Sequence, residues 1–154
     1  MKALVIGATG ATGKDLVNVL LEDVFYTDVV IFVRRSSKIV HTKLREIITD
    51  FDKLESVREF IKGDVLFSCL GTTLKAAGSK EKQWHVDYEI PLQFATIAKQ
   101  NGVAQMVLLS AYGASAKSRV FYSRIYAIDS GNRKARFNCD LFQRGPELES
   151  PGRL

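Results

Sequence analysis

Residues 2–13 read KALVIGATGATG, and this stretch decides the fold. A short apolar run leads directly into three glycines at intervals of three residues, Gly7, Gly10 and Gly13. Apolar residues at helical spacing follow them: Leu16, Val17, Leu20 and Leu21. A strand, a tight glycine turn and a helix in this order predict a phosphate site, because backbone N–H groups and the positive end of the helix dipole meet there. Glycine permits the sharp turn and the close approach of a pyrophosphate. The alternative is a structural turn without a ligand.

The rest of the chain alternates between apolar runs and helical patterns. We expect further strands at 28–33, 44–49, 64–70 and 103–110, and 136–142 is a candidate sixth strand. A helix is expected from Asp52 to about Gly63, because Asp52 and Glu55 resemble a capping box. A longer helix ends near Gly102, with Pro91 at a kink or restart. Strands that are apolar throughout are typical of a parallel sheet covered on both faces. The sequence therefore predicts an α/β fold, a doubly wound parallel Rossmann-type sheet with helices on both faces.

Length and composition narrow the class of protein. The chain has 154 residues, 46% of them hydrophobic, which predicts a single globular domain over residues 1–154. Its two cysteines, Cys69 and Cys139, have no metal-ligand spacing and form no disulfide framework. We therefore predict no metal site, and a cytoplasmic location in a reducing compartment. No signal peptide and no membrane-spanning run are recognised.

The net charge of +5 is concentrated in one basic stretch, residues 34–45. The stretch is either a solvated loop or a site for an anionic ligand. Nucleic acid is not predicted as a partner, because no aromatic residues are interleaved with the charge and no recognition module accompanies it.

In a parallel sheet of this kind, ligands bind beyond the carboxyl ends of the strands. Arg34 and Arg35 follow the second strand, about 20 residues past the glycine loop, where a nicotinamide-cofactor domain has its ribose selector. An acid there would favour NAD, whereas guanidinium groups suit the 2′-phosphate of NADP. The sequence therefore predicts NADP, with NAD less favoured, unless both arginines are plain surface charges. After the third strand, Asp50 and Phe51 are candidates to contact adenine, although Asp50 is equally suited to starting a helix.

The fourth strand ends in Cys69, Leu70, Gly71, Thr72 and Thr73. Small residues here let the backbone pass close to a cofactor, and the threonine hydroxyls suit a ribose or phosphate; the alternative is an ordinary glycine turn. Cys69 is interpreted as a small buried filler.

A polar and aromatic cluster lies at the start of the long helix, formed by Trp84, His85, Asp87 and Tyr88. His85 and Asp87 are two residues apart, so a helix does not place them on one face. We interpret this cluster as packing first, with a cofactor contact as the alternative.

The motifs GATGATG, FVRR, CLGTT, VDYEIPLQFATIAKQNGV, LLSAYGA and FYSRI resemble the atypical short-chain dehydrogenase/reductases, in particular the Tat-interacting-protein-like oxidoreductases. The resemblance covers residues 1–125. It implies that the glycine loop binds the pyrophosphate, the arginine after the second strand the 2′-phosphate, and the loop after the fourth strand the rest of the cofactor. The predicted cofactor-binding residues are Gly7, Thr9, Gly10, Ala11, Thr12, Gly13, Arg34, Arg35, Asp50, Phe51, Leu70, Gly71 and Thr72.

The same resemblance implies a catalytic serine, tyrosine and lysine, the last two as YxxxK. Ser110 and Tyr122 match the serine and the tyrosine, whereas Tyr126 occupies the lysine position and supplies no positive charge. After about residue 125 the chain departs from the family pattern and is short.

Two functions follow. The first is an NADP-dependent oxidoreductase acting on a small carbonyl or alcohol. The second is a regulatory or redox-sensing protein that binds NADP(H) without catalysis.

Overall fold

The computed structural model describes residues 1–111 and 138–144, in which six parallel strands form one sheet. The strands are β1 (Lys2–Ile6), β2 (Asp28–Val33), β3 (Leu44–Ile48), β4 (Val65–Ser68), β5 (Gln105–Ala111) and β6 (Asn138–Arg144). Their order across the sheet is β3-β2-β1-β4-β5-β6, and every neighbouring pair is parallel. From β1 the chain adds β2 and β3 toward one edge of the sheet, and it then adds β4, β5 and β6 toward the other edge. This change of side between β1 and β4 is typical of a doubly wound Rossmann sheet.

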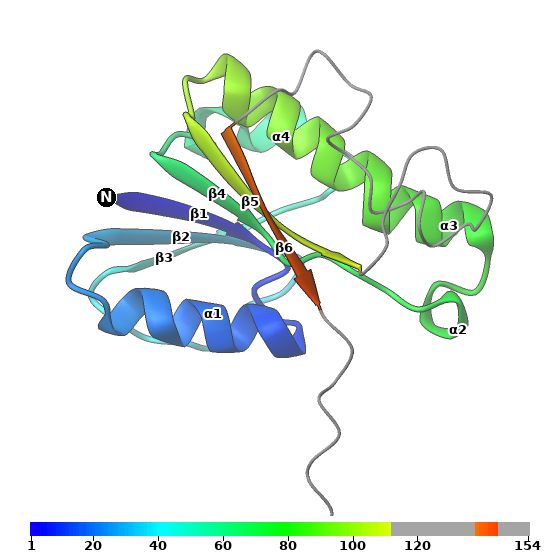
Figure 1. Ribbon diagram of the computed structural model, residues 1–154, viewed down its shortest axis with the longest axis horizontal. Helices are drawn as coiled ribbons and strands as arrows, with labels where there is room; N and C mark the ends of the chain where they lie inside the picture. The colour runs from blue at the N-terminus through cyan, green and yellow to red at the C-terminus, as the bar shows by residue number, and fades with distance from the viewer. Residues whose placement is uncertain (112–137, 145–154) are drawn as a thin grey trace, which may run out of the picture.

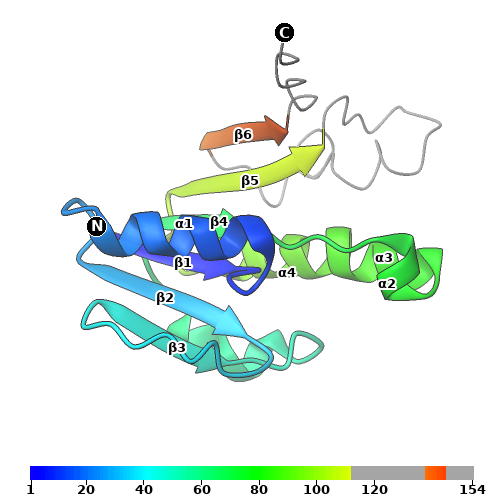
Figure 2. The ribbon, with the colours of Figure 1, turned by 90° about the horizontal axis from the view of Figure 1, so that it is seen from below.

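Helices cover both faces of this sheet (Figure 1). They are α1 (Ala11–Glu22), the 3-10 helix η1 (Leu54–Phe60), α2 (Leu74–Ala77), α3 (Lys80–Trp84), the π-helix η2 (His85–Glu89) and α4 (Ile90–Gln100). Helix α1 lies on one face, and α3 and α4 lie on the other. Figure 2 shows β3 and β6 at opposite edges of the sheet. The predicted fold class is confirmed.

Alternate side chains of β1 enter two separate cores. Ala3 and Val5 face α1 and pack with Val17, whereas Leu4 and Ile6 face the α4 side. These four side chains are fully buried. Burial of a large apolar side chain contributes roughly 1.5–3 kcal/mol, so a strand buried on both faces anchors the glycine turn that follows it.

The helix predicted from Asp52 to about Gly63 is wrong in type and extent. The structure has a 3-10 helix there, η1, which begins after Lys53 and has no side-chain cap. The Asp52 carboxylate instead accepts a hydrogen bond from His85 Nε2 at 2.7 Å, which removes it from the capping role. The apolar side chains Leu54 and Val57 of this segment are both buried.

Pro91 lies at a restart of the long helix, as the sequence predicts. The π-helix η2 runs directly into α4, and Pro91 lies in the first turn of α4. Because proline has no N–H to donate, the first turn is the place where a helix tolerates it.

The short helix α2 was missed by the sequence analysis, which expected a loop there. The Thr73 hydroxyl accepts from the Ala76 N–H at 3.2 Å and caps its start. Gly78, with a φ of +84°, ends it.

Candidate functional site

The glycine turn after β1 packs tightly against the end of β4. Gly7 has a φ of +81°, and a Cβ atom there would lie 2.4 Å from the carbonyl carbon of Cys69. A Cβ atom on Gly13 would lie 2.0 Å from the carbonyl oxygen of Gly7. Both distances are shorter than real Cβ contacts allow, so the fold itself requires glycine at these two positions.

Gly10 differs from the other two glycines. A Cβ atom there would meet only the carbonyl oxygen of Gly7, at 3.4 Å, which is an ordinary contact. Gly10 is the exposed N-cap residue of α1, with extended backbone angles that any residue adopts. Nothing in the packing of the turn therefore requires glycine at this position, and the side of Gly10 that lacks a side chain is open for a ligand.

A cavity of about 740 Å³ lies beside this turn, at the carboxyl ends of β1, β2 and β4. Its size is typical of a site for a small molecule or cofactor. The predicted residues that line it are Gly7, Thr9, Gly10, Arg34, Phe51, Leu70, Gly71 and Thr72. Predicted residues from four separate stretches of sequence are therefore brought to one cavity, and the open face of Gly10 is part of its wall.

The remaining predicted cofactor residues do not line this cavity. Ala11, Thr12 and Gly13 form the first turn of α1, and Arg35 is exposed one residue beyond Arg34. The Asp50 carboxylate accepts a hydrogen bond from the Asp52 N–H at 3.1 Å and lies 3.9 Å from Lys53 Nζ. Asp50 thus takes part in the local turn after β3.

A buried polar network holds the loop after β4. The Asp87 carboxylate, in a residue only 2% exposed, accepts a hydrogen bond from the Thr72 N–H at 2.7 Å. The Gln83 side-chain amide donates to the Thr72 carbonyl at 3.1 Å and to Asp87 at 3.4 Å. Both backbone groups of Thr72 are therefore held by side chains from α3 and η2. The sequence analysis did not assign this role to either residue.

The second wall of the cavity comes mainly from α2, α3, η2 and the start of α4. Of these, the sequence indicated only the cluster at 84–88, as an alternative to packing. The additional lining residues are Cys69, Ala76, Ala77, Glu81, Lys82, His85, Val86 and Ile90. The polar and aromatic cluster at 84–88 was the signal for this wall. Its Trp84 and Tyr88 rings do pack together, 4.5 Å apart, but its His85 lines the cavity.

Cys69 is a half-buried free thiol that lines this cavity. Burial raises its pKa above the ordinary value, so the thiol stays protonated near neutral pH. This agrees with the interpretation of Cys69 as a small filler, because the thiolate is the nucleophilic form.

The two predicted catalytic residues differ in what the structure describes. Ser110 belongs to β5 and pairs in register with Gln143 of β6, near the carboxyl end of the sheet. Tyr122, and Tyr126 at the position of the family lysine, lie outside the described residues. In the described part of the chain, no group of three or more His, Cys, Asp or Glu side chains is placed to hold a metal ion.

Comparison with known proteins points to one cofactor class. A family model described as NAD(P)H-binding matches residues 7–133. Protein HTATIP2 from Rattus norvegicus is 32% identical over 125 residues, which are 79% of this chain and 51% of that protein. "Protein FMP52, mitochondrial" from Saccharomyces cerevisiae is 32% identical over 128 residues, 81% of this chain and 55% of that protein. The chain thus spans about half the length of the curated relatives it matches.

Solved structures share the fold at low sequence identity. The oxidoreductase ylbE from Lactococcus lactis superposes with a TM-score of 0.70 at 18% identity, covering 93% of this chain and 68% of that one. MoeE5 in complex with UDP-glucuronic acid and NAD superposes with a TM-score of 0.71 at 18% identity, covering 92% of this chain and 53% of that one.

The location of the protein in the cell stays a prediction. Within residues 1–111 and 138–144, no helix is both long enough and apolar enough to cross a membrane. The word mitochondrial stands in the names of the FMP52 relatives, so a cytoplasmic location is not confirmed by them.

The glycine turn, the cavity beside it and the comparisons agree on a nicotinamide dinucleotide as the cofactor. The open face of Gly10 at the start of α1 fits a pyrophosphate. The chain belongs to the NAD(P)H-binding family and has a Rossmann fold.

Proposed function

We propose that this protein is an NADP-dependent oxidoreductase that acts on a small carbonyl or alcohol. One observation carries the choice of NADP. Arg34 directly follows β2 and lines the cavity, at the position where an acid would select NAD. The planar, positively charged guanidinium of arginine can donate two hydrogen bonds to the negatively charged 2′-phosphate.

In this proposal each wall of the cavity has a part in binding. The first turn of α1 and Gly10 hold the pyrophosphate, Arg34 holds the 2′-phosphate, and Phe51 and Leu70 pack by the adenine. The Asp87 network holds Thr72, so the loop after β4 keeps its shape. When bound, the cofactor supplies or accepts a hydride at its nicotinamide ring.

Two residues are proposed for the proton transfer that accompanies the hydride. Ser110 orients the carbonyl or alcohol, and Tyr122 gives or takes the proton. Tyrosine has an ordinary pKa of about 10, so it is a weak acid–base group near neutral pH without a neighbouring cation. Tyr126 supplies no such charge.

The residue at position 126 favours a second candidate function. A protein with an intact dinucleotide cavity and no lysine one helical turn after Tyr122 suits a regulatory or redox-sensing role, in which NADP(H) binds without turnover. The two functions share the cavity and differ in whether Tyr122 transfers a proton.

The test of NADP dependence is the dissociation constant for NADPH and for NADH, measured by calorimetry. A hydrogen bond to a charged group contributes about 1.5–3 kcal/mol, so NADPH should bind at least about tenfold more tightly. Arg34→Ala combined with Arg35→Ala should remove the preference. Lys38→Ala is the matched control, because it removes a charge from the same connection at a residue outside the cavity wall. Equal affinity of the unaltered protein for the two cofactors would overturn the choice of NADP.

A further inference from the structure

His85 has a carboxylate on each of its two ring nitrogens. Its Nδ1 lies 2.7 Å from Glu89 Oε2, and its Nε2 lies 2.7 Å from Asp52 Oδ1. An ionised carboxylate only accepts hydrogen bonds, and a neutral imidazole has a single N–H. With both carboxylates ionised, only the doubly protonated imidazolium satisfies both contacts.

The two partners of His85 have different positions in the chain. Glu89 lies four residues further along the same helical segment. Asp52 lies 33 residues earlier, in the turn between β3 and η1. The bond to Asp52 is therefore the one that joins two separate elements across the end of the cavity.

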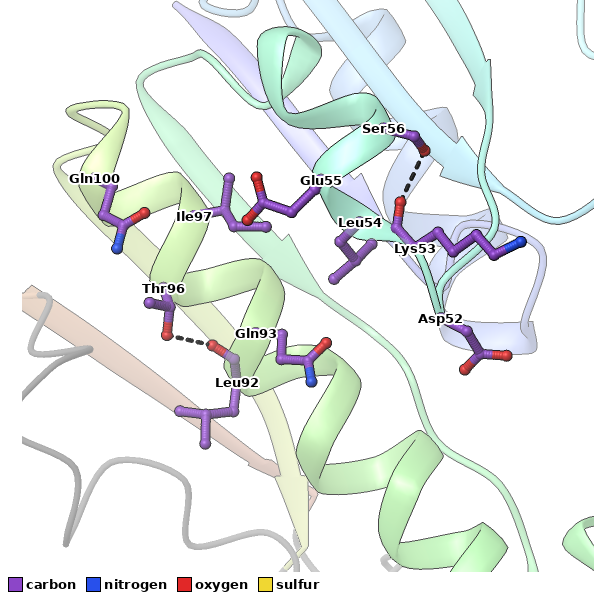
Figure 3. Close-up of a pocket in the computed structure, with 10 residues that line it drawn as sticks. All are labelled: Asp52, Lys53, Leu54, Glu55, Ser56, Leu92, Gln93, Thr96, Ile97 and Gln100. Carbon is purple, nitrogen blue, oxygen red and sulfur yellow. Dashed lines mark hydrogen bonds between the residues drawn. The ribbon is translucent and has the colours of Figure 1, made fainter.

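This bond lies between two cavities. His85 lines the cavity of about 740 Å³ that contains the glycine turn, and so does Phe51, the residue before Asp52. Asp52 lines a second cavity of about 540 Å³ between η1 and α4 (Figure 3). Phe51 directly precedes Asp52 in the same turn and is only 8% exposed, in the core cluster that also contains Leu54. The His85–Asp52 pair thus connects helix η2, which lines the cavity, to the turn that carries Phe51.

Other charged groups face the same region. Glu81 and Lys82 of α3, and Arg34 after β2, line the cavity with His85. Lys53 follows Asp52 and lies by Asp50. The hydrogen bonds of Glu89 and then of Asp52 raise the pKa of His85 above its ordinary value. These contacts outweigh the effect of partial burial, which alone would lower that pKa.

We propose that His85, in its doubly protonated form, is a positioning residue for the dinucleotide, because its bond to Asp52 fixes the Phe51 wall of the cavity. The inference rests on the proposed function, since it concerns binding at the same cavity. When His85 loses a proton, one ring nitrogen presents a lone pair to a carboxylate, and one of the two contacts opens. Loss of the Asp52 contact releases the turn that carries Phe51, and NADPH binds more weakly.

The expected change in affinity is modest because the pair is partly exposed, with 38% of the His85 side chain and 73% of the Asp52 side chain accessible. We expect the dissociation constant of NADPH to rise about fivefold between pH 6 and pH 9, at the low end of coupling between sites. By the same linkage, bound NADPH should raise the pH at which His85 titrates.

The experiment measures NADPH binding by fluorescence from pH 6 to pH 9 in the unaltered protein, His85→Gln, Asp52→Asn and Glu89→Gln. The pH-dependent part of the affinity should disappear in His85→Gln and Asp52→Asn. In Glu89→Gln the side-chain amide donates to the Nδ1 lone pair of a neutral His85, whose Nε2–H stays on Asp52, so the pH dependence should shrink there as well. Glu59→Gln is the matched control, because Glu59 pairs with Lys62 outside the cavity wall, and in this variant the dependence should remain. NADH is titrated in parallel, because the 2′-phosphate of NADPH itself titrates near pH 6.

A second measurement reads His85 directly. The imidazole ring protons are followed by NMR with and without NADPH, and His85→Gln assigns the signal against that of His41, the second histidine of the chain. An upward shift of the His85 midpoint on binding supports the inference. If NADPH binds but the pH profiles of the unaltered protein and His85→Gln coincide and the midpoint stays put, this inference alone is overturned. If neither NADPH nor NADH binds at any pH, the proposed function is overturned with it.

Discussion

Replacement of Gly10 by valine separates the ligand-binding role of the glycine turn from its structural role. The structure leaves room for a Cβ atom at this exposed position, because the nearest atom that it would meet is the Gly7 carbonyl oxygen, 3.4 Å away. Valine is a poorer N-cap than glycine by about 0.5–1 kcal/mol. Valine also lowers the conformational entropy of the unfolded chain, which stabilises the folded protein by about 0.4–1 kcal/mol. The free energy of unfolding of Gly10→Val should therefore stay within about 1 kcal/mol of the original value.

Binding should respond very differently. The valine side chain would occupy the space at the start of α1 where the pyrophosphate meets the backbone N–H groups. Loss of one hydrogen bond to a charged group weakens binding by about 1.5–3 kcal/mol, which raises the dissociation constant about tenfold to somewhat more than a hundredfold. Calorimetry with NADPH measures the affinity, and urea unfolding measures the stability of the same sample.

Gly13→Ala is the contrasting variant. Its Cβ atom would lie 2.0 Å from the Gly7 carbonyl oxygen, so the backbone of the turn must move. Crowding of this kind destabilises a fold by about 1–3 kcal/mol. A folded Gly10→Val protein with unchanged affinity for NADPH would refute the reasoning, because the glycines would then form a turn without a ligand.

Three further outcomes are expected. Asp87→Leu leaves the partly buried Thr72 N–H without its acceptor and should lower the free energy of unfolding by about 1–3 kcal/mol while weakening NADPH binding; a stable variant with unchanged affinity would contradict the role of Asp87 in holding Thr72. Tyr126→Lys should raise NADPH oxidation on a panel of aldehydes, ketones and quinones by up to about 10²–10⁴-fold, and brisk turnover of the original chain that is lost in Tyr122→Phe would show that another group replaces the lysine. Because the pKa of His85 is raised on folding, its contribution to stability is complete below about pH 6.5 and is lost as the pH rises through the folded pKa; urea unfolding of the unaltered protein and His85→Gln should therefore differ most at pH 6 and least at pH 9, and a constant difference would contradict this assignment.

Most of the fold could be predicted because its signals are local. The apolar run before Gly7, the β-branched run of β2 and the helical spacing after Gly13 each specify an element from neighbouring residues alone. Parallel pairing was predicted because most of the strands are apolar on both faces. The one wrong helix, at 52–63, failed at a residue whose side chain is used elsewhere. Asp52 has the sequence position of a cap, but His85 engages its carboxylate.

The candidate site also has a part that local sequence signals predicted and a part that depends on the tertiary structure. Motif positions alone indicated the glycine turn, Arg34 and the loop after β4, because each directly follows a strand and parallel strands end at one edge of the sheet. For the wall that faces them, the sequence indicated only the cluster at 84–88, as an alternative to packing, because the geometry of this wall depends on where the chain folds back.

The sequence by itself determined that this chain forms a doubly wound sheet with a dinucleotide turn, because hydrophobic period and glycine spacing act over a few residues. The tertiary structure alone decided which side chains hold that turn and its cavity in shape. Asp87 meets Thr72 across 15 residues, and His85 meets Asp52 across 33. Such contacts leave no periodic signal, because they join groups that become neighbours only after the strands and helices have packed. They also decide the charge state of His85, which depends on two carboxylates that only the folded chain brings to one ring.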